Sequence, residues 1–253
     1  MIRMDEVSVV YPTGVCALQP TCIEFKRGRF TVLLGASGAG KSTLLRTLNG
    51  LVRPTHGDIL VSGHRSIFSS GRALREHRSR TGMIFQQHHL IGRMTALRNV
   101  LMGRLAVYGS LRTLAPMRKA DRLIALEALD RVGLVDRALH RVDELSGGQQ
   151  QRVGIARAMA QRPQIILADE PVASLDPATA AMVLADLHRI CREDQITAIV
   201  SLHQVDLARQ FADHVICLAG GRCVFEGEPQ NLRPNVLQDV YTPPHQPLAN
   251  AAE

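Results

Sequence analysis

The chain has 253 residues, of which 45% are hydrophobic and 21% charged, and its formal net charge is +7. This length and composition predict one large α/β domain with a sizeable core, and the absence of any run of roughly 18 to 20 apolar residues argues against a membrane span. The N-terminal sequence lacks the apolar stretch and cleavage site of a secretory signal, so we expect a cytoplasmic protein unless a partner holds it at a membrane.

The positive charge suits anionic partners such as nucleotides, nucleic acid or phospholipid headgroups. Much of it lies in two runs, residues 72–80 and 118–122. We interpret these runs as solvated helix surface, with contact to an anionic membrane as the alternative. The cysteines form no CxxC pair and no zinc spacing. We expect reduced, mostly buried thiols at Cys16, Cys22, Cys191, Cys217 and Cys223.

The first segments alternate between apolar and polar residues, which predicts antiparallel edge strands at 7–11 and 22–25. The apolar run 30–34 predicts a buried strand. It leads through a glycine-rich loop into a helix with Leu44, Leu45 and Leu48 on one face, and Asn49-Gly50 ends that helix.

The middle of the chain changes from strand to helix patterns. A turn is predicted at 53–58, with short strands at 59–61 and 83–85. From about residue 86 to 145 helical periodicity dominates, over 95–105 and over 116–132, where Gly133 is a plausible cap. We therefore expect an inserted helical subdomain at about 87–145.

Strands and helices alternate again in the last third. Strands are predicted at 165–168 and 196–200, helices at 177–191 and 205–212, and a hairpin of 214–218 with 223–225 across Gly220-Gly221. This alternation predicts a mainly parallel sheet with helices on both faces. We expect a single domain over residues 1–242, followed by a loose proline-rich tail over 243–253.

Residues 35–42 match the phosphate-binding loop pattern, with a strand before it and a helix after it. The glycines let backbone N–H groups surround a phosphate, and the helix directs its positive end at the same anion. Lys41 is predicted to reach the β- and γ-phosphates, and Ser42 to bind Mg²⁺. The predicted phosphate-binding residues are Gly35, Ala36, Ser37, Gly38, Ala39, Gly40, Lys41, Ser42 and Thr43.

The apolar strand at 165–168 ends in two carboxylates, Asp169 and Glu170. A carboxylate at that position suits the magnesium site of a phosphate-loop enzyme, so Asp169 is predicted to hold the ion. Glu170, one residue further, is placed to polarise the attacking water.

Residues 145–152 predict a second anion-binding helix start, because Ser146 is a good N-cap and Gly147 and Gly148 leave the backbone amides open. One nucleotide needs one phosphate loop, so a second such site is surplus within a single active site. The surplus is explained if this segment of one subunit completes the site of another.

With these motifs the sequence resembles an ABC transporter ATPase over nearly its whole length. The resemblance implies a P-loop NTPase core of the RecA-like α/β class, with an N-terminal antiparallel β subdomain and an inserted helical subdomain. It identifies Ser146-Gly147-Gly148-Gln149 as the family signature and 174–176 as the loop that crosses the dimer interface.

The resemblance also implies roles for single residues. Tyr11 would stack on adenine, Gln86 would contact Mg²⁺ and sense a membrane partner, and His203 would hydrogen-bond the γ-phosphate. The implied catalytic residues are Glu170, His203 and Lys41, and the implied magnesium residues are Ser42, Gln86 and Asp169.

The implied cofactors are ATP and Mg²⁺. The implied assembly is a homodimer of ATPase subunits on transmembrane permease subunits, served indirectly by a solute-binding protein, at the cytoplasmic face of the inner membrane. No nucleic-acid partner is expected.

Four strings resemble the phosphonate-importer branch of the family: 85–93, 99–105, 168–177 and 202–206. None of them should touch the transported solute, so this inference is by family analogy. Ala36 stands where a proline is common, which allows a divergent solute such as phosphite. The alternatives are an ATPase of another importer, an exporter or a lipid-handling system. A soluble ABC ATPase acting on nucleic acid is disfavoured because the chain has one domain and a short helical insert.

Overall fold

The computed structural model describes residues 1–61, 65–87, 89–108 and 117–241, and the predicted tail over 243–253 lies outside them. The strands are β1 (Ile2–Val10), β2 (Cys16–Phe25), β3 (Phe30–Leu34), β4 (His56–Val61), β5 (Arg65–Ser66), β6 (Thr81–Ile84), β7 (Ile165–Asp169), β8 (Thr197–Ser201), β9 (His214–Ala219) and β10 (Arg222–Gly227). The helices are α1 (Lys41–Leu48), α2 (Gly71–Ser79), α3 (Ala96–Met102), α4 (Lys119–Arg131), α5 (Gly147–Ala160), α6 (Pro177–Glu193), α7 (Val205–Phe211) and α8 (Pro234–Tyr241). Within these ranges no helix is both long enough and apolar enough to span a bilayer.

Two sheets form the frame of the molecule. The smaller, with strand order β2-β1-β4-β5, is antiparallel. The larger has the order β10-β9-β3-β8-β7-β6; β9, β3, β8, β7 and β6 run parallel, and β10 runs antiparallel to β9. Because parallel strands end at the same edge, the loops after β3, β6, β7 and β8 gather at one edge of this sheet.

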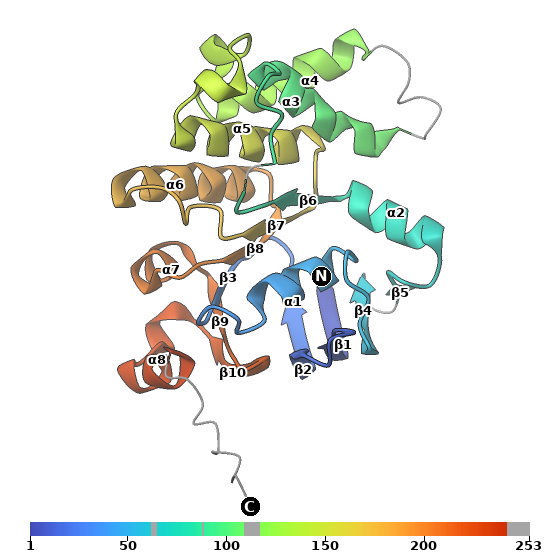
Figure 1. Ribbon diagram of the computed structural model, residues 1–253, viewed down its shortest axis with the longest axis vertical. Coiled ribbons are helices and arrows are strands. Elements are labelled where there is room, and N and C mark those ends of the chain that lie inside the picture. Colours follow the sequence, from blue (N-terminus) through green and yellow to red (C-terminus); the bar gives the residue numbers. More distant parts are fainter. Residues whose placement is uncertain (62–64, 88, 109–116, 242–253) are drawn as a thin grey trace, which may run out of the picture.

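The larger sheet is covered on both faces, as Figure 1 shows. Val32 and Leu34 of β3 belong to a core shared with α3, α4, α5 and α6. Leu33 belongs to a second core, shared with α1 and the smaller sheet. All three side chains are fully buried. A strand that is apolar on both faces is what the continuous run of hydrophobic residues predicts.

The first helix after β3 follows its predicted course. Leu44, Leu45 and Leu48 are fully buried, and burial of each stabilises the fold by roughly 1.5–3 kcal/mol. The backbone N–H of Asn49 bonds the Leu45 carbonyl, and Gly50 follows with a φ of +69°. A glycine in this left-handed backbone conformation commonly follows the last turn of a helix, so α1 ends where the sequence predicts.

The helical layer consists of α3, α4 and α5, which pack against one another. A buried ion pair stabilises it: Arg104 Nε lies 2.9 Å from Asp121 Oδ1, and the same guanidinium donates to the Ala160 carbonyl at the end of α5. Burial would raise the pKa of Asp121, but hydrogen bonds from the Tyr108 hydroxyl and Arg104 lower it below its ordinary value. Asp121 is therefore the anionic anchor that joins α4 to the turn after α3.

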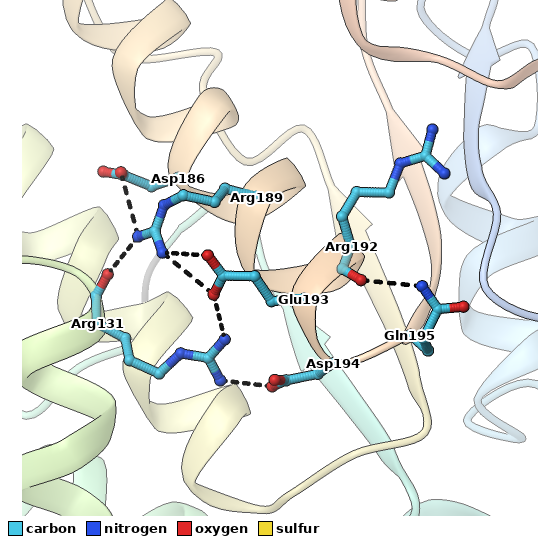
Figure 2. A network of polar contacts seen from close by, with 7 residues as sticks. All are labelled: Arg131, Asp186, Arg189, Arg192, Glu193, Asp194 and Gln195. Carbon is cyan, nitrogen blue, oxygen red and sulfur yellow. Dashed lines mark hydrogen bonds and ion pairs between the residues drawn. The ribbon is translucent and has the colours of Figure 1, made fainter.

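The helical layer is also joined to α6 by charged side chains. Figure 2 shows Arg131 at the end of α4 between Glu193 and Asp194 at the end of α6. Arg131 donates to Glu193 at 2.9 Å and to Asp194 at 2.5 Å, while Arg189 donates to the Arg131 carbonyl at 2.8 Å. The two helices therefore meet through a small network rather than one pair.

Some local predictions differ from the structure: strands β1 and β2 begin well before the predicted residues 7 and 22. Strand β4 begins at His56, inside the predicted turn, and helix α8 was not predicted. Cys16 and Cys22 are exposed, so the expectation of mostly buried thiols is wrong for them. Cys22 occupies an outward position in a strand whose neighbours Thr21 and Ile23 point inward, and alternation leaves that position in solvent.

Candidate active site

The phosphate loop joins β3 to α1 and is held in a closed shape by Lys41. Its Nζ donates to the carbonyls of Gly35, at 2.7 Å, and Ala36, at 3.0 Å. Gly40 has a φ of +103°, and a Cβ there would lie 2.5 Å from the Ala17 carbonyl, so only glycine fits. The loop backbone therefore surrounds the Lys41 ammonium and leads directly into the first turn of α1.

Lys41 is almost fully buried, with 4% of its surface exposed. Burial lowers the pKa of its ammonium, and the nearby carboxylates of Glu170 and Asp169 act in the opposite direction. A desolvated cation next to a helix start favours a polyanion, which would replace the carbonyl contacts of Lys41.

Asp169, at the end of β7, reaches the phosphate-loop helix. Its Oδ1 accepts a hydrogen bond from Ser42 Oγ at 2.9 Å, across a sequence separation of 127 residues. It also accepts from Ser201 Oγ at 3.0 Å, at the end of β8. The structure thus brings together two of the three predicted magnesium residues, Ser42 and Asp169.

Glu170 and His203 lie side by side. His203 Nε2 is 2.5 Å from Glu170 Oε1, and both residues follow neighbouring strands, β8 and β7. Glu170 has a φ of +48°, a left-handed conformation that costs a non-glycine residue about 1–3 kcal/mol. The N–H of Glu170 donates to Ser201 Oγ at 2.8 Å, which helps to hold this conformation. The two predicted catalytic side chains are therefore positioned together with Lys41 at one edge of the sheet.

Ser201 is a site residue that sequence reasoning missed. Its fully buried hydroxyl contacts the Asp169 carboxylate and the Glu170 backbone N–H, so it links β8 to both residues. Its one signal in the sequence is its position: a polar residue at the end of an otherwise apolar strand, Thr197–Ser201, two residues before His203.

Tyr11 lies beside the first turn of α1. Its hydroxyl is 3.2 Å from Thr43 Oγ1, and its ring is half-buried against the core that contains α1. The predicted adenine-stacking residue is therefore adjacent to the phosphate loop. Gln86, the remaining predicted magnesium residue, is exposed in the segment after β6, and β6 pairs with β7 up to Ala168. It thus follows the strand next to the one that ends in Asp169.

The second helix start has the predicted cap. Ser146 Oγ accepts from the Gln149 N–H, and the Gln149 side chain accepts from the Ser146 N–H, which forms a complete capping box. A Cβ on Gly148 would lie 2.6 Å from Thr179 Cγ2 on α6, so glycine allows α5 to begin close to α6. Asp176, in the loop before α6, caps that helix in the same way by accepting from the Thr179 N–H.

The two helix starts predicted to bind anions are on different sides of the larger sheet. Helix α1 packs in the core with the small antiparallel sheet, and α5 packs in the core with α6 and the helical layer. The phosphate loop before α1 and the Ser146 cap of α5 are therefore on opposite faces of the sheet within one chain.

The sequence profile of the ABC transporter family matches residues 18–173, which include the phosphate loop, the capped start of α5 and Glu170. The chain belongs to the ABC transporter family. Its fold is that of an ATP-binding cassette.

The chain is similar to named relatives along almost its full length. It is 61% identical to the phosphite import ATP-binding protein PxtA of Stutzerimonas stutzeri, covering 95% of this chain and 87% of the relative. It is 58% identical to the phosphonates import ATP-binding protein PhnC 3 of Nostoc sp. strain PCC 7120, covering 95% and 92%. Among solved structures, the dimeric post-hydrolysis state of the ATP-binding cassette MJ0796, bound to ADP and Pi, is 34% identical with a TM-score of 0.79, covering 90% of this chain and 99% of that one.

Proposed function

We propose that this ABC cassette is the ATP-hydrolysing subunit of an importer for phosphonate or a related phosphorus anion such as phosphite. The observation that carries the solute class is the 58–61% identity to relatives named for phosphonate and phosphite import. The site residues supply the ATPase chemistry, and the solute class comes from the relatives alone.

Each predicted residue has a role that its position supports. Backbone amides of the phosphate loop and Lys41 Nζ bind the β- and γ-phosphates and stabilise the charge that develops on them. Glu170 accepts a proton from the attacking water, and His203, which touches Glu170, keeps that carboxylate and the γ-phosphate in register. Tyr11 stacks on adenine.

The oxygen atoms near the phosphate loop fit Mg²⁺. Mg²⁺ prefers oxygen ligands and is commonly bound by one or two carboxylates together with substrate phosphates. Ser42 Oγ and Asp169 Oδ1, 2.9 Å apart, offer a hydroxyl and a carboxylate oxygen, and Gln86 would add an amide oxygen. When bound, the ion would neutralise charge on the β- and γ-phosphates.

We further propose a homodimer in which each ATP lies between the phosphate loop of one subunit and the Ser146 start of α5 of the other. The separation of α1 and α5 into different cores supports this arrangement, as does the dimeric form of MJ0796. ATP closes the dimer, and hydrolysis lets it reopen.

The partner in the membrane would be a permease dimer that holds this chain at the cytoplasmic face of the inner membrane, with a solute-binding protein on the other side. A groove of about 380 Å³ between the core and the helical layer is a suitable docking place. Apolar side chains line it together with polar ones such as Arg78 and Gln161, and the apolar Leu51 and Met102 there are 51% and 40% exposed. Exposed apolar surface of this kind marks contact sites.

Growth of a strain that lacks this gene tests the proposal, with methylphosphonate, phosphite or phosphate as the sole phosphorus source. We expect a growth defect on methylphosphonate or phosphite that is rescued by the wild-type gene and not by Glu170→Gln. Equal growth on all three, in a strain with no second uptake system, would contradict the solute assignment and leave the ATPase intact.

A further inference from the structure

The last described helix, α8, ends against the active site. Tyr241, at its C-terminal end, donates a hydrogen bond from its hydroxyl to the backbone carbonyl of His203 at 3.3 Å. His203 is the residue whose side chain contacts Glu170. The helix is thus one hydrogen bond away from the pair that is proposed to hydrolyse ATP, although 38 residues separate Tyr241 from His203.

The same hydroxyl faces the phosphate loop. Burial raises the pKa of Tyr241 above its ordinary value, the Cys217 thiol acts in the same direction, and the Gly35 N–H lowers it. Cys217 pairs with Leu34 in the β3–β9 register, so it lies immediately before the loop that begins at Gly35. Tyr241 therefore lies between the first residue of the phosphate loop and the His203 loop.

Helix α8 is fixed to the rest of the molecule independently of this contact. Val240 is buried, and Val236 and Leu237 pack against the core that contains α6. The helix contacts β9 and β10, and Arg209 of α7 donates to the Leu232 carbonyl just before it at 3.0 Å. Since the Tyr241 residue itself is 37% exposed, its ring contributes less to this anchoring than its buried neighbours do.

We propose that Tyr241 is a positioning residue for ATP hydrolysis, holding the His203 backbone in register with the phosphate loop from the C-terminal helix. This inference rests on the proposed function, because it acts through His203. The hydroxyl bonds the His203 backbone carbonyl, so it would fix where the His203 side chain starts without contacting the nucleotide or the attacking water.

The test is a comparison of full-length wild type, Tyr241→Phe and Gln238→Ala in steady-state ATP hydrolysis with Mg²⁺. Tyr241→Phe removes only the hydroxyl, and Gln238 is an exposed residue of the same helix. Losing one hydrogen bond that matters only during hydrolysis should lower kcat about 3- to 10-fold and leave the KM for ATP within about 2-fold. Gln238→Ala should match wild type.

A double-mutant cycle with His203→Ala distinguishes positioning of His203 from a merely structural role of Tyr241. Radiolabelled ATP makes the slow hydrolysis measurable. In that background Tyr241→Phe should have no further effect, because the side chain that it positions is gone. An unchanged kcat in the single variant, or the same fold-loss with and without His203, would overturn the proposal. The proposed function fails separately if wild type does not hydrolyse ATP or if His203→Ala alone has no effect.

Discussion

At the residue scale, the site depends on contacts between strand ends as much as on its motifs. Ser42, Asp169 and Glu170 are each predictable from the sequence, because each lies in a recognisable pattern. Ser201 is not, since a serine at a strand end has no pattern of its own. Only the pairing of β7 with β8 shows that it reaches the Asp169 carboxylate and the Glu170 backbone N–H.

Ser201→Ala should reduce both stability and turnover. The change leaves the half-buried Glu170 N–H without its acceptor and removes one hydrogen bond to Asp169, so we expect the free energy of unfolding to fall by about 1–3 kcal/mol. Urea unfolding and ATPase assays measure the two effects, with the exposed Ser69→Ala as a control. Wild-type values for both quantities would show that this hydroxyl does not organise the site.

Glu170→Gln should separate binding from hydrolysis. The amide keeps the shape of the side chain but cannot take a proton, so ATP turnover should fall at least about 100-fold while ATP affinity stays near wild type. Phosphate release and equilibrium nucleotide binding are the measurements, and the exposed Glu228→Gln is the matched control. Near-wild-type turnover would exclude Glu170 as the base.

At the element scale, the sequence predicts the strands and helices that are long, apolar and bounded by turn residues. Strand β3, helix α1 and the β9–β10 hairpin occur where the patterns place them. Helix α8 was missed because its eight residues give only two turns of apolar periodicity, and no neighbouring motif marks it as the phosphate loop marks the equally short α1. Its packing on β9 and β10, which is tertiary, stabilises it.

A buried histidine, His77, joins α2 to the end of α1, and we expect it to make the stability of the fold depend on pH. Burial lowers the pKa of His77 below its ordinary value of 6.5, and the ring nitrogen Nε2 is 2.7 Å from the Leu48 carbonyl. The pKa of His77 is therefore higher in the unfolded chain than in the folded chain. The stability contributed by neutral His77 is lost as the pH falls below the pKa of His77 in the unfolded chain.

The stability difference between wild type and His77→Gln should therefore narrow when the pH is lowered from about 7.5 to about 5.5. Chemical unfolding at each pH measures it, and His56→Gln controls for the loss of an exposed histidine. A difference that stays constant or widens would contradict a neutral buried His77.

The junction of α4 and α6 is a second element-scale feature (Figure 2). Arg131 is 24% exposed and pairs with Glu193 and Asp194, which are more exposed, so each pair should contribute about 0.2–1 kcal/mol. Arg131→Met should lower the free energy of unfolding by about 1 kcal/mol at low salt and by less at about 1 M salt. A salt-independent loss would indicate that packing of the arginine stem, not its charge, joins the helices.

At the scale of the whole molecule, strand order determines what the motifs can do. The phosphate loop, Glu170 and His203 come from distant parts of the sequence, and they meet because β3, β8 and β7 are neighbours in a parallel sheet. The sequence predicts that these residues share a site through family resemblance. The sequence does not show that α1 and α5 pack in different hydrophobic cores, because that depends on how the two faces of the sheet are covered.

In the proposed dimer, ATP is bound between two copies of this chain. Sedimentation velocity of Glu170→Gln, with and without ATP and Mg²⁺, tests it most directly, with the same variant also carrying Ser146→Arg as the comparison. We expect an ATP-dependent dimer that Ser146→Arg abolishes while ATP still binds. A monomer in the presence of bound ATP, or a dimer indifferent to Ser146→Arg, would contradict a site shared between two subunits.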